Sequence, residues 1–283
     1  MNPPSIDALV NGIHRSFGSY GPVLDEIEEA LNDPQGSLAT VADAIAQDPD
    51  FTARLLRLGN SAYYGFPRRL TTVTETISLI GLQQVQDLIS ASSIVDTFAG
   101  LSPAAVNMGS FWQHSLACGI GARALAQARR EPKPDSYFVA GLLHDVGRLV
   151  LFSQAPKMAK EVFLAYGQER LLLREAEVKV LGYDHAQIGE ALLRLWQLPA
   201  NLVYAVARHH QPASGEVFRT EAAIVHVADH MMNALQTGSS GERFVPPLNM
   251  AAWEELRLPR EALGSVVTAI DEQFEAVQEA FRI

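Results

Sequence analysis

The sequence has a single cysteine, no long uninterrupted hydrophobic run and little positive charge. Cys118 alone cannot form a disulfide within the chain, and one cysteine excludes a zinc site built mainly of thiolates. The most apolar stretch, residues 138–152, is interrupted by a histidine and two charged residues, so it is not a transmembrane span. The first residues show no basic segment followed by an apolar core. We therefore expect no signal peptide, no membrane association and a cytoplasmic location.

Basic residues are too few and too scattered to form an obvious binding face. The chain has 22 Lys and Arg against 32 Asp and Glu, which gives a formal net charge of −10. Pairs such as Arg68-Arg69 and Arg129-Arg130 lie far apart in the sequence. Because nucleic-acid binding usually needs a basic face that neutralises phosphates, we expect no direct binding of DNA or RNA.

Strand patterns are also scarce, and helical patterns occur in their place. No run of alternating β-branched residues is bounded by turns, whereas apolar residues recur at spacings of three and four. In the clearest case, Asp48 can cap a helix that begins at Pro49. Phe51, Leu55 and Leu58 would then share one face of that helix. We predict an all-α fold.

Two polar segments divide the helical patterns. Residues 99–103 separate a first group of helices from the segment that starts near Phe111, and residues 237–241 begin a polar loop that ends at Pro246-Pro247. We therefore predict an N-terminal helical lobe over residues 1–100, a central lobe over residues 101–236, and a C-terminal loop with closing helices over residues 237–283.

Histidines are concentrated in the predicted central lobe, where seven of the eight fall between residues 114 and 230. Imidazole and carboxylate groups hold Fe, Mn or Zn ions with open positions for water or phosphate. A His-Asp pair at a helix end, such as His144-Asp145, can present both side chains to one centre, and Asp145 could bridge a second ion. We predict a divalent-metal site with one or two ions. Its candidate ligands are His114, His144, Asp145, His185, His209, His210 and Asp229.

Each candidate also has a purely structural interpretation. A lone histidine at a helix end, such as His114 or His185, is more often a cap or a hydrogen-bonded core residue. The His209-His210 pair could be a solvated helix terminus. Asp229 is harder to explain in this way, because an unpaired carboxylate buried in an apolar helix is costly. His226 or His230 could pair with Asp229, or His226 could face inward in its place. The spacing alone leaves both interpretations open.

The motif around the His-Asp pair resembles a known signature. Residues 143–147, LHDVG, look like the doublet of HD-superfamily metal-dependent phosphohydrolases, whose pattern is a His, then His-Asp, then a distant Asp. The residues that match this order are His114, His144, Asp145 and Asp229. His185 and His209-His210 are similar to additional histidines of two-metal members. In the phosphohydrolase interpretation, Asp145 bridges two ions.

The N-terminal lobe resembles one branch of that superfamily, the HDOD domain. The hallmark of this domain is matched by residues 46–65, AQDPDFTARLLRLGNSAYYG, and by residues 76–81, TISLIG. The resemblance spans residues 21–230 and implies an N-terminal helical lobe packed on an HD-hydrolase-like helical lobe. HDOD domains are understood as regulatory output modules of bacterial signalling that act through other proteins. The implied partners are regulatory or signalling proteins.

Three positions depart from related patterns. Cyclic-di-GMP phosphodiesterases have a Gly-Tyr-Pro element after the third ligand, where residues 185–191 read HAQIGEA, so we expect no hydrolysis of cyclic-di-GMP. The phosphohydrolase lysine after the glycine is replaced by Arg148, which keeps the charge but not the compact ammonium. Residues 18–23, GSYGPV, differ from the double-proline start of HDOD domains.

Two functions follow as hypotheses. The first is a bacterial signalling protein that acts through protein contacts and retains a His/Asp metal site. The alternative is a metal-dependent phosphohydrolase acting on a nucleotide or another phosphoester, with Asp145 and Arg148 as its catalytic candidates. A third hypothesis joins them, with metal or nucleotide binding shifting the lobes and changing a partner surface.

Overall fold

The computed structural model describes residues 3–17, 29–30, 37–212 and 217–282. Residues 18–23, where the sequence differs from the HDOD start, lie outside this part. The described residues form helices and no strand, so the prediction of an all-α fold is confirmed. The helices are α1 (Ile6–Phe17), α3 (Leu38–Ala46), α4 (Pro49–Gly59), α5 (Val73–Ile80), α6 (Leu82–Thr97), α7 (Met108–Arg129), α8 (Pro134–Leu143), α9 (Val146–Gln154), α10 (Pro156–Glu169), α11 (Leu173–Leu181), α12 (His185–Leu195), α13 (Ala200–Arg208), α14 (Arg219–Leu235), α15 (Met250–Leu256) and α16 (Ala262–Phe281).

Helix α4 shows how the sequence directs its own local structure. The Asp48 side chain accepts a hydrogen bond from the Phe51 backbone N–H at 2.9 Å, and Pro49 occupies the first turn. Phe51, Leu55 and Leu58 are buried on one face. The predicted helix and its core face are therefore confirmed.

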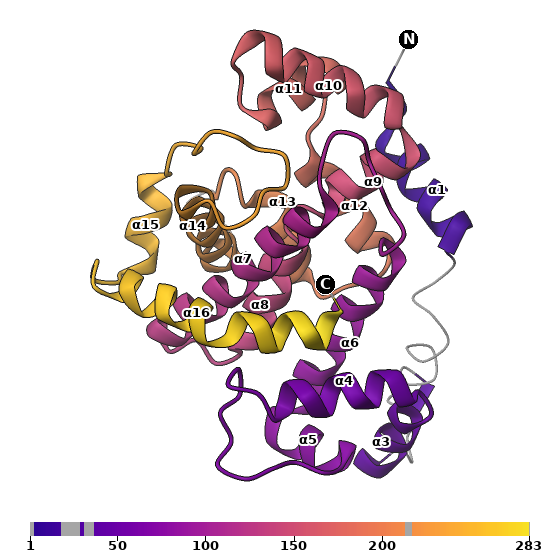
Figure 1. Ribbon diagram of the computed structural model, residues 1–283, viewed down its shortest axis with the longest axis vertical. Helices are drawn as coiled ribbons and strands as arrows, with labels where there is room; N and C mark the ends of the chain where they lie inside the picture. The colour runs from indigo at the N-terminus through magenta and orange to yellow at the C-terminus, as the bar shows by residue number, and fades with distance from the viewer. Residues whose placement is uncertain (1–2, 18–28, 31–36, 213–216, 283) are drawn as a thin grey trace.

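The helices form two groups that a long C-terminal helix connects (Figure 1). Helices α3, α4 and α5 lie together at the lower end, while α7, α8, α13 and α14 pack around a central core. Helix α16 contacts both α4 and α7, and α1 contacts α9 and α12 instead of α3. The boundaries at residues 100 and 236 stay predictions, because α1 and α16 contact helices across them.

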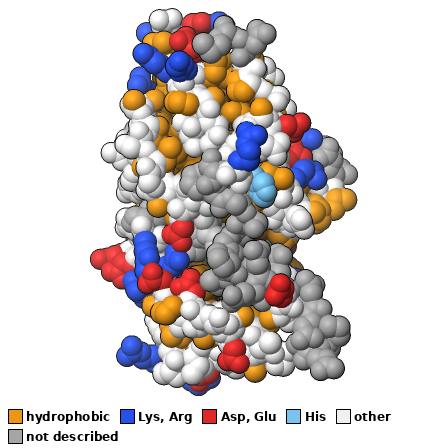
Figure 2. Space-filling model, turned by 90° about the vertical axis from the view of Figure 1, so that its right-hand side faces the viewer, with side chains coloured by type: hydrophobic (Ala, Val, Ile, Leu, Met, Phe, Trp, Pro, Cys, Tyr) orange, Lys and Arg blue, Asp and Glu red, His pale blue; other side chains and the backbone are white. Residues whose placement is uncertain are grey.

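The surface charge and the helix lengths concern two expectations, the lack of nucleic-acid binding and the lack of a membrane span. On the face shown in Figure 2, the Lys and Arg side chains of the described residues are scattered among Asp and Glu. Across the described parts of the chain, no helix combines the length and the apolar character that a membrane span needs. The expected lack of nucleic-acid binding stays a prediction.

A buried polar cluster joins the two groups of helices. Asp135, at the start of α8, accepts hydrogen bonds from Tyr63 Oη and Arg123 Nε, each at 2.9 Å. The Arg123 guanidinium also lies 3.8 Å from the centre of the Tyr63 ring, in cation–π contact. Tyr63 belongs to the HDOD-like motif, so this motif is anchored directly to α7 and α8.

Helices α7 and α8 approach each other at backbone distance. A Cβ atom built on Gly141 would lie 2.6 Å from the carbonyl oxygen of Cys118, and one on Gly119 would lie 2.9 Å from that of Phe138. Glycine at both positions allows this contact, which would otherwise be blocked by a methyl group. The crossing places His114 and Cys118 of α7 beside the C-terminal end of α8.

We predict that Gly141→Ala lowers the free energy of unfolding by about 3 kcal/mol, because rigid backbone cannot move away from the added methyl group. Gly167→Ala is the matched control. Apart from the neighbouring backbone of α10 itself, no atom of the described residues lies within 4 Å of a Cβ at Gly167, so the better helix former should raise stability by about 0.5–1 kcal/mol. Denaturant unfolding measures both. Equal stability of the two variants would contradict the proposed contact.

Candidate metal centre

The structure brings the seven predicted ligands together at one place. His114 lies in α7, His144 and Asp145 join α8 to α9, and His185 begins α12. His209 and His210 follow α13, and Asp229 lies in α14. Within this set, the fully buried side chains are those of His114, His144, His185 and His209. Residues 115 positions apart in sequence thus meet in a desolvated centre.

One group of donor atoms surrounds Asp229. His114 Nε2 lies 3.1 Å from Asp229 Oδ1, and His144 Nε2 lies 3.6 Å from the same oxygen. His144 Nε2 is also 3.2 Å from Asp145 Oδ2. We call His114, His144 and Asp229 the first donor set.

A second group of donor atoms surrounds His185. Its Nε2 atom lies 2.9 Å from Asp145 Oδ1, 2.8 Å from His210 Nε2 and 3.5 Å from His209 Nε2. We call His185, His209 and His210 the second donor set. The two oxygens of Asp145 face different sets, which is the geometry that a bridging carboxylate requires.

Hydrogen bonds to Nδ1 turn the Nε2 atoms towards the centre. The Nδ1–H groups of His144 and His209 donate to the carbonyl oxygens of Gly141 and Val206, each at 2.7 Å. Their Nε2 atoms therefore carry the lone pair in the neutral ring. Metal-binding histidines are commonly held by such a bond at the opposite nitrogen.

Close approach of α9 to α12 positions His185. A Cβ on Gly147 would lie 2.0 Å from the His185 carbonyl oxygen, so only glycine permits this contact. The Glu177 carboxylate accepts hydrogen bonds from both His185 Nδ1–H and the His185 backbone N–H. A carboxylate that holds a histidine in this way raises its basicity as a ligand.

Sequence reasoning missed Glu177. The available signal was its place on the inner face of α11, where Leu173, Ala176, Glu177 and Leu181 are buried at helical spacing. A buried glutamate on such a face needs a partner. Its partners come from α9 and α12, which the spacing within α11 could not identify.

Arg148 is the central cation of the surrounding network. Its Nε donates to Glu177 Oε1 at 3.1 Å, and its Nη1 donates to Asp145 Oδ2 at 2.8 Å and to Ser240 Oγ. The side chain is almost completely buried. Arg148 therefore orients both carboxylates, and the predicted polar loop at residues 237–241 contributes to the network through Ser240.

Burial and the neighbouring charges shift the pKa values of the side chains in the centre. Burial lowers the pKa of His144, but Asp145 and Asp229 outweigh burial and raise that pKa to about 10. Burial raises the pKa of Asp145, yet Arg148 and the neighbouring histidines hold it well below its usual range. Burial lowers the pKa of His209 to about 3, so its ring stays neutral. The two carboxylates thus demand protons or cations nearby.

The donor atoms fit a divalent metal ion. His144 Nε2 is buried and makes no hydrogen bond to any described residue, while the Nε2 atoms of His185 and His210 approach within 2.8 Å. Converging lone pairs and carboxylates repel each other unless a proton or a metal ion lies between them. Nitrogen and oxygen donors of this kind suit Fe, Mn or Zn.

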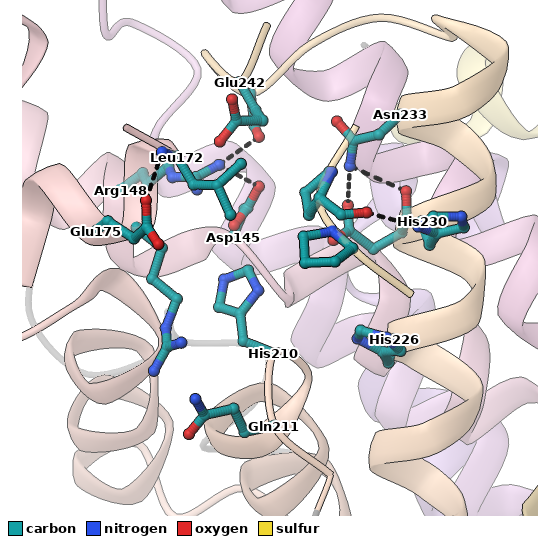
Figure 3. A pocket seen from close by; sticks show the side chains of 15 residues that line it. Asp145, Arg148, Leu172, Glu175, His210, Gln211, His226, His230, Asn233 and Glu242 are labelled. Atoms are coloured by element: carbon teal, nitrogen blue, oxygen red, sulfur yellow. Dashed lines mark hydrogen bonds and ion pairs between the residues drawn. The ribbon is translucent and has the colours of Figure 1, made fainter. Parts of the chain in front are cut away.

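A cavity of about 260 Å³ opens onto the centre, with Asp145, Arg148 and His210 on one side and α14 on the other (Figure 3). His226 does not pair with Asp229. Its Nδ1–H donates to His209 O at 2.7 Å, and its Nε2 accepts from a backbone N–H at 2.9 Å. Both ring nitrogens of His226 are therefore hydrogen-bonded to the backbone, and His226 has a structural role.

We predict that Glu177→Gln lowers metal affinity by about 10- to 100-fold, because the neutral amide no longer holds His185 as a basic ligand. Isothermal titration with zinc measures the affinity. Glu190→Gln on α12 removes only an exposed ion pair with Arg194 and should leave affinity unchanged. Equal affinities of the two variants would show that Glu177 does not support the centre.

Comparisons with known proteins agree with this fold. The HDOD domain family matches residues 19–212. An HDOD domain protein of unknown function from Geobacter sulfurreducens has a TM-score of 0.70 at 25% identity, over 98% of both chains. A Shewanella amazonensis SB2B protein, named as a candidate phosphohydrolase, has a TM-score of 0.70 at 22% identity, over 97% of both chains.

A curated, uncharacterised protein of Treponema pallidum (strain Nichols) is 25% identical over 258 residues. The alignment covers 90% of this chain and 49% of that protein, so the chain spans about half the length of this relative. The resemblance to the HDOD domain family is confirmed by the family match over most of the chain. The chain belongs to the HDOD domain family.

Proposed function

We propose that the chain is a signalling protein that acts through contacts with regulatory proteins and holds two divalent metal ions in its central helices. The observation that carries the metal part of the proposal is that the two carboxylate oxygens of Asp145 face different donor sets. Its Oδ1 atom faces the second donor set and its Oδ2 atom faces the first. The histidines and Asp229 would complete the two sets. In this role the ions fix the arrangement of α7, α8, α12, α13 and α14.

A groove of about 1020 Å³ supports the contact part of the proposal. It lies between α4, the loop over residues 60–72 and α16, beside the HDOD-like motif. Arg57, Arg68 and Arg69 line it and are exposed, in a chain whose net charge is −10. Phe66 adds an apolar surface. This combination fits an acidic segment of a partner protein that also carries an apolar side chain.

Charge reversal tests this docking surface. Immobilised wild-type protein should capture a defined regulatory protein from lysate, and the double variant Arg57→Glu and Arg69→Glu should capture at least about tenfold less because like charges repel. Arg194→Glu, at an exposed position of α12, is the control and should capture as much as the wild type. Equal capture by the double variant would place the docking surface elsewhere.

A phosphohydrolase is the second candidate, and the cavity that reaches Asp145, His210 and Asp229 favours it. A pair of divalent ions, when bound, would supply a hydroxide nucleophile and clamp a phosphoryl group. The chain's own residues provide less support for binding a phosphate group. Arg148 uses its Nε and Nη1 on Asp145, Glu177 and Ser240, so these donors are not free for phosphate.

We expect no turnover of nucleotides or bis(p-nitrophenyl) phosphate after loading with Mn or Fe, because the buried arginine donors are engaged within the protein. Released phosphate or nitrophenol measures the activity. The control is Asp145→Asn, which removes the bridging charge. Turnover by the wild type that Asp145→Asn abolishes would establish the hydrolase and reject the purely signalling role.

A further inference from the structure

The thiol of Cys118 lies against the first donor set. Cys118 follows His114 by one turn of α7, so both side chains share one face of that helix. Its Sγ lies 3.6 Å from His114 Nε2, and the residue is fully buried. The donor atoms of His114, Cys118, His144 and Asp229 all lie within 4.8 Å of one another.

These separations suit one tetrahedral ion. Bonds of about 2.0–2.1 Å to nitrogen or oxygen and about 2.3 Å to sulfur place tetrahedral ligand atoms about 3.3–3.6 Å apart. The contacts of His114 Nε2 with Cys118 Sγ and Asp229 Oδ1 are 3.6 Å and 3.1 Å. His144 Nε2 lies 3.6 Å from Asp229 Oδ1. The sulfur therefore stands at a ligand's distance.

Two further observations indicate a ligand at this position. His144 Nε2, fully buried and without a hydrogen bond to any described residue, is directed at the same space. Asp145 Oδ2, the carboxylate oxygen on this side, already accepts a hydrogen bond from Arg148 at 2.8 Å. Asp229 Oδ1 in turn accepts a hydrogen bond from Asn233 Nδ2 at 2.7 Å, so both carboxylate oxygens at this position are shared with other donors, and an added thiolate would supply further negative charge to a divalent ion.

We propose that Cys118 is a thiolate ligand of the metal ion held by His114, His144 and Asp229. On binding, the S–H proton leaves to solvent and the sulfur lone pair forms the bond to the metal. A soft thiolate selects Zn or Fe over Mn at this position, whereas the second donor set has nitrogen and oxygen donors. The inference rests on the proposed metal centre and makes its two positions chemically different.

A buried cysteine more commonly serves as a small apolar core residue. That role and the ligand role differ in a measurable way. The chain has one cysteine, so a thiolate sulfur found in the metal's coordination shell identifies Cys118. The intact chain loaded with zinc is sufficient, and neither a substrate nor a partner is needed.

X-ray absorption at the zinc edge provides the test, at one and at two equivalents of zinc. We expect a sulfur shell at about 2.3 Å beside the nitrogen and oxygen shell at about 2.0–2.1 Å. Cys118→Ser should lose the sulfur shell and at least about 100-fold in zinc affinity, more than loss of an outer partner costs, while manganese affinity changes less. Cobalt-loaded wild type should show a thiolate-to-metal charge-transfer band that the variant lacks.

The outcomes separate the two proposals. Stoichiometric zinc with only nitrogen and oxygen neighbours overturns the role of Cys118 and leaves the metal centre in place. Failure to bind zinc, iron or manganese overturns both. Should Cys118→Ser fail to fold, the wild-type sulfur shell and cobalt band decide alone, because they do not depend on the variant.

Discussion

The backbone contact between α7 and α8 is the constraint on which the centre depends. Glycines at positions 119 and 141 let the backbones of the two helices approach each other closely. One consequence is that His114 and Cys118 face the His144-Asp145 pair. A wider crossing would move the donor atoms beyond the distance that one ion can bridge, so the packing of two helices determines the chemistry.

Around this crossing, buried charges hold each other in place. Arg148 bonds to Asp145 and Glu177, and Glu177 in turn orients His185. Removing any one partner would leave an uncompensated charge in a desolvated interior. The cost of such a charge is far larger than the stabilisation that an exposed ion pair provides. The network therefore resists rearrangement and keeps the donor atoms aligned even where side chains repel each other.

The same two helices also connect the centre to the N-terminal group of helices. Asp135 at the start of α8 and Arg123 in α7 hold Tyr63 of the HDOD-like motif, while His144 directly follows α8 and His114 lies nearer the start of α7. Rigid helices can transmit a displacement from one end to the other. A partner docked beside the motif and an ion in the centre would thus act on shared elements.

The sequence by itself determined the all-α class, the α4 helix with its Asp48 cap and the family, because these depend on local periodicity and on contiguous motifs. The seven candidate ligands were also recognisable, although spacing left a structural role open for each. Only the tertiary structure decided that they converge, that Glu177 and Arg148 support them, and that His226 does not. Those contacts join residues far apart in the chain, and their distances follow from helix packing that no local pattern encodes.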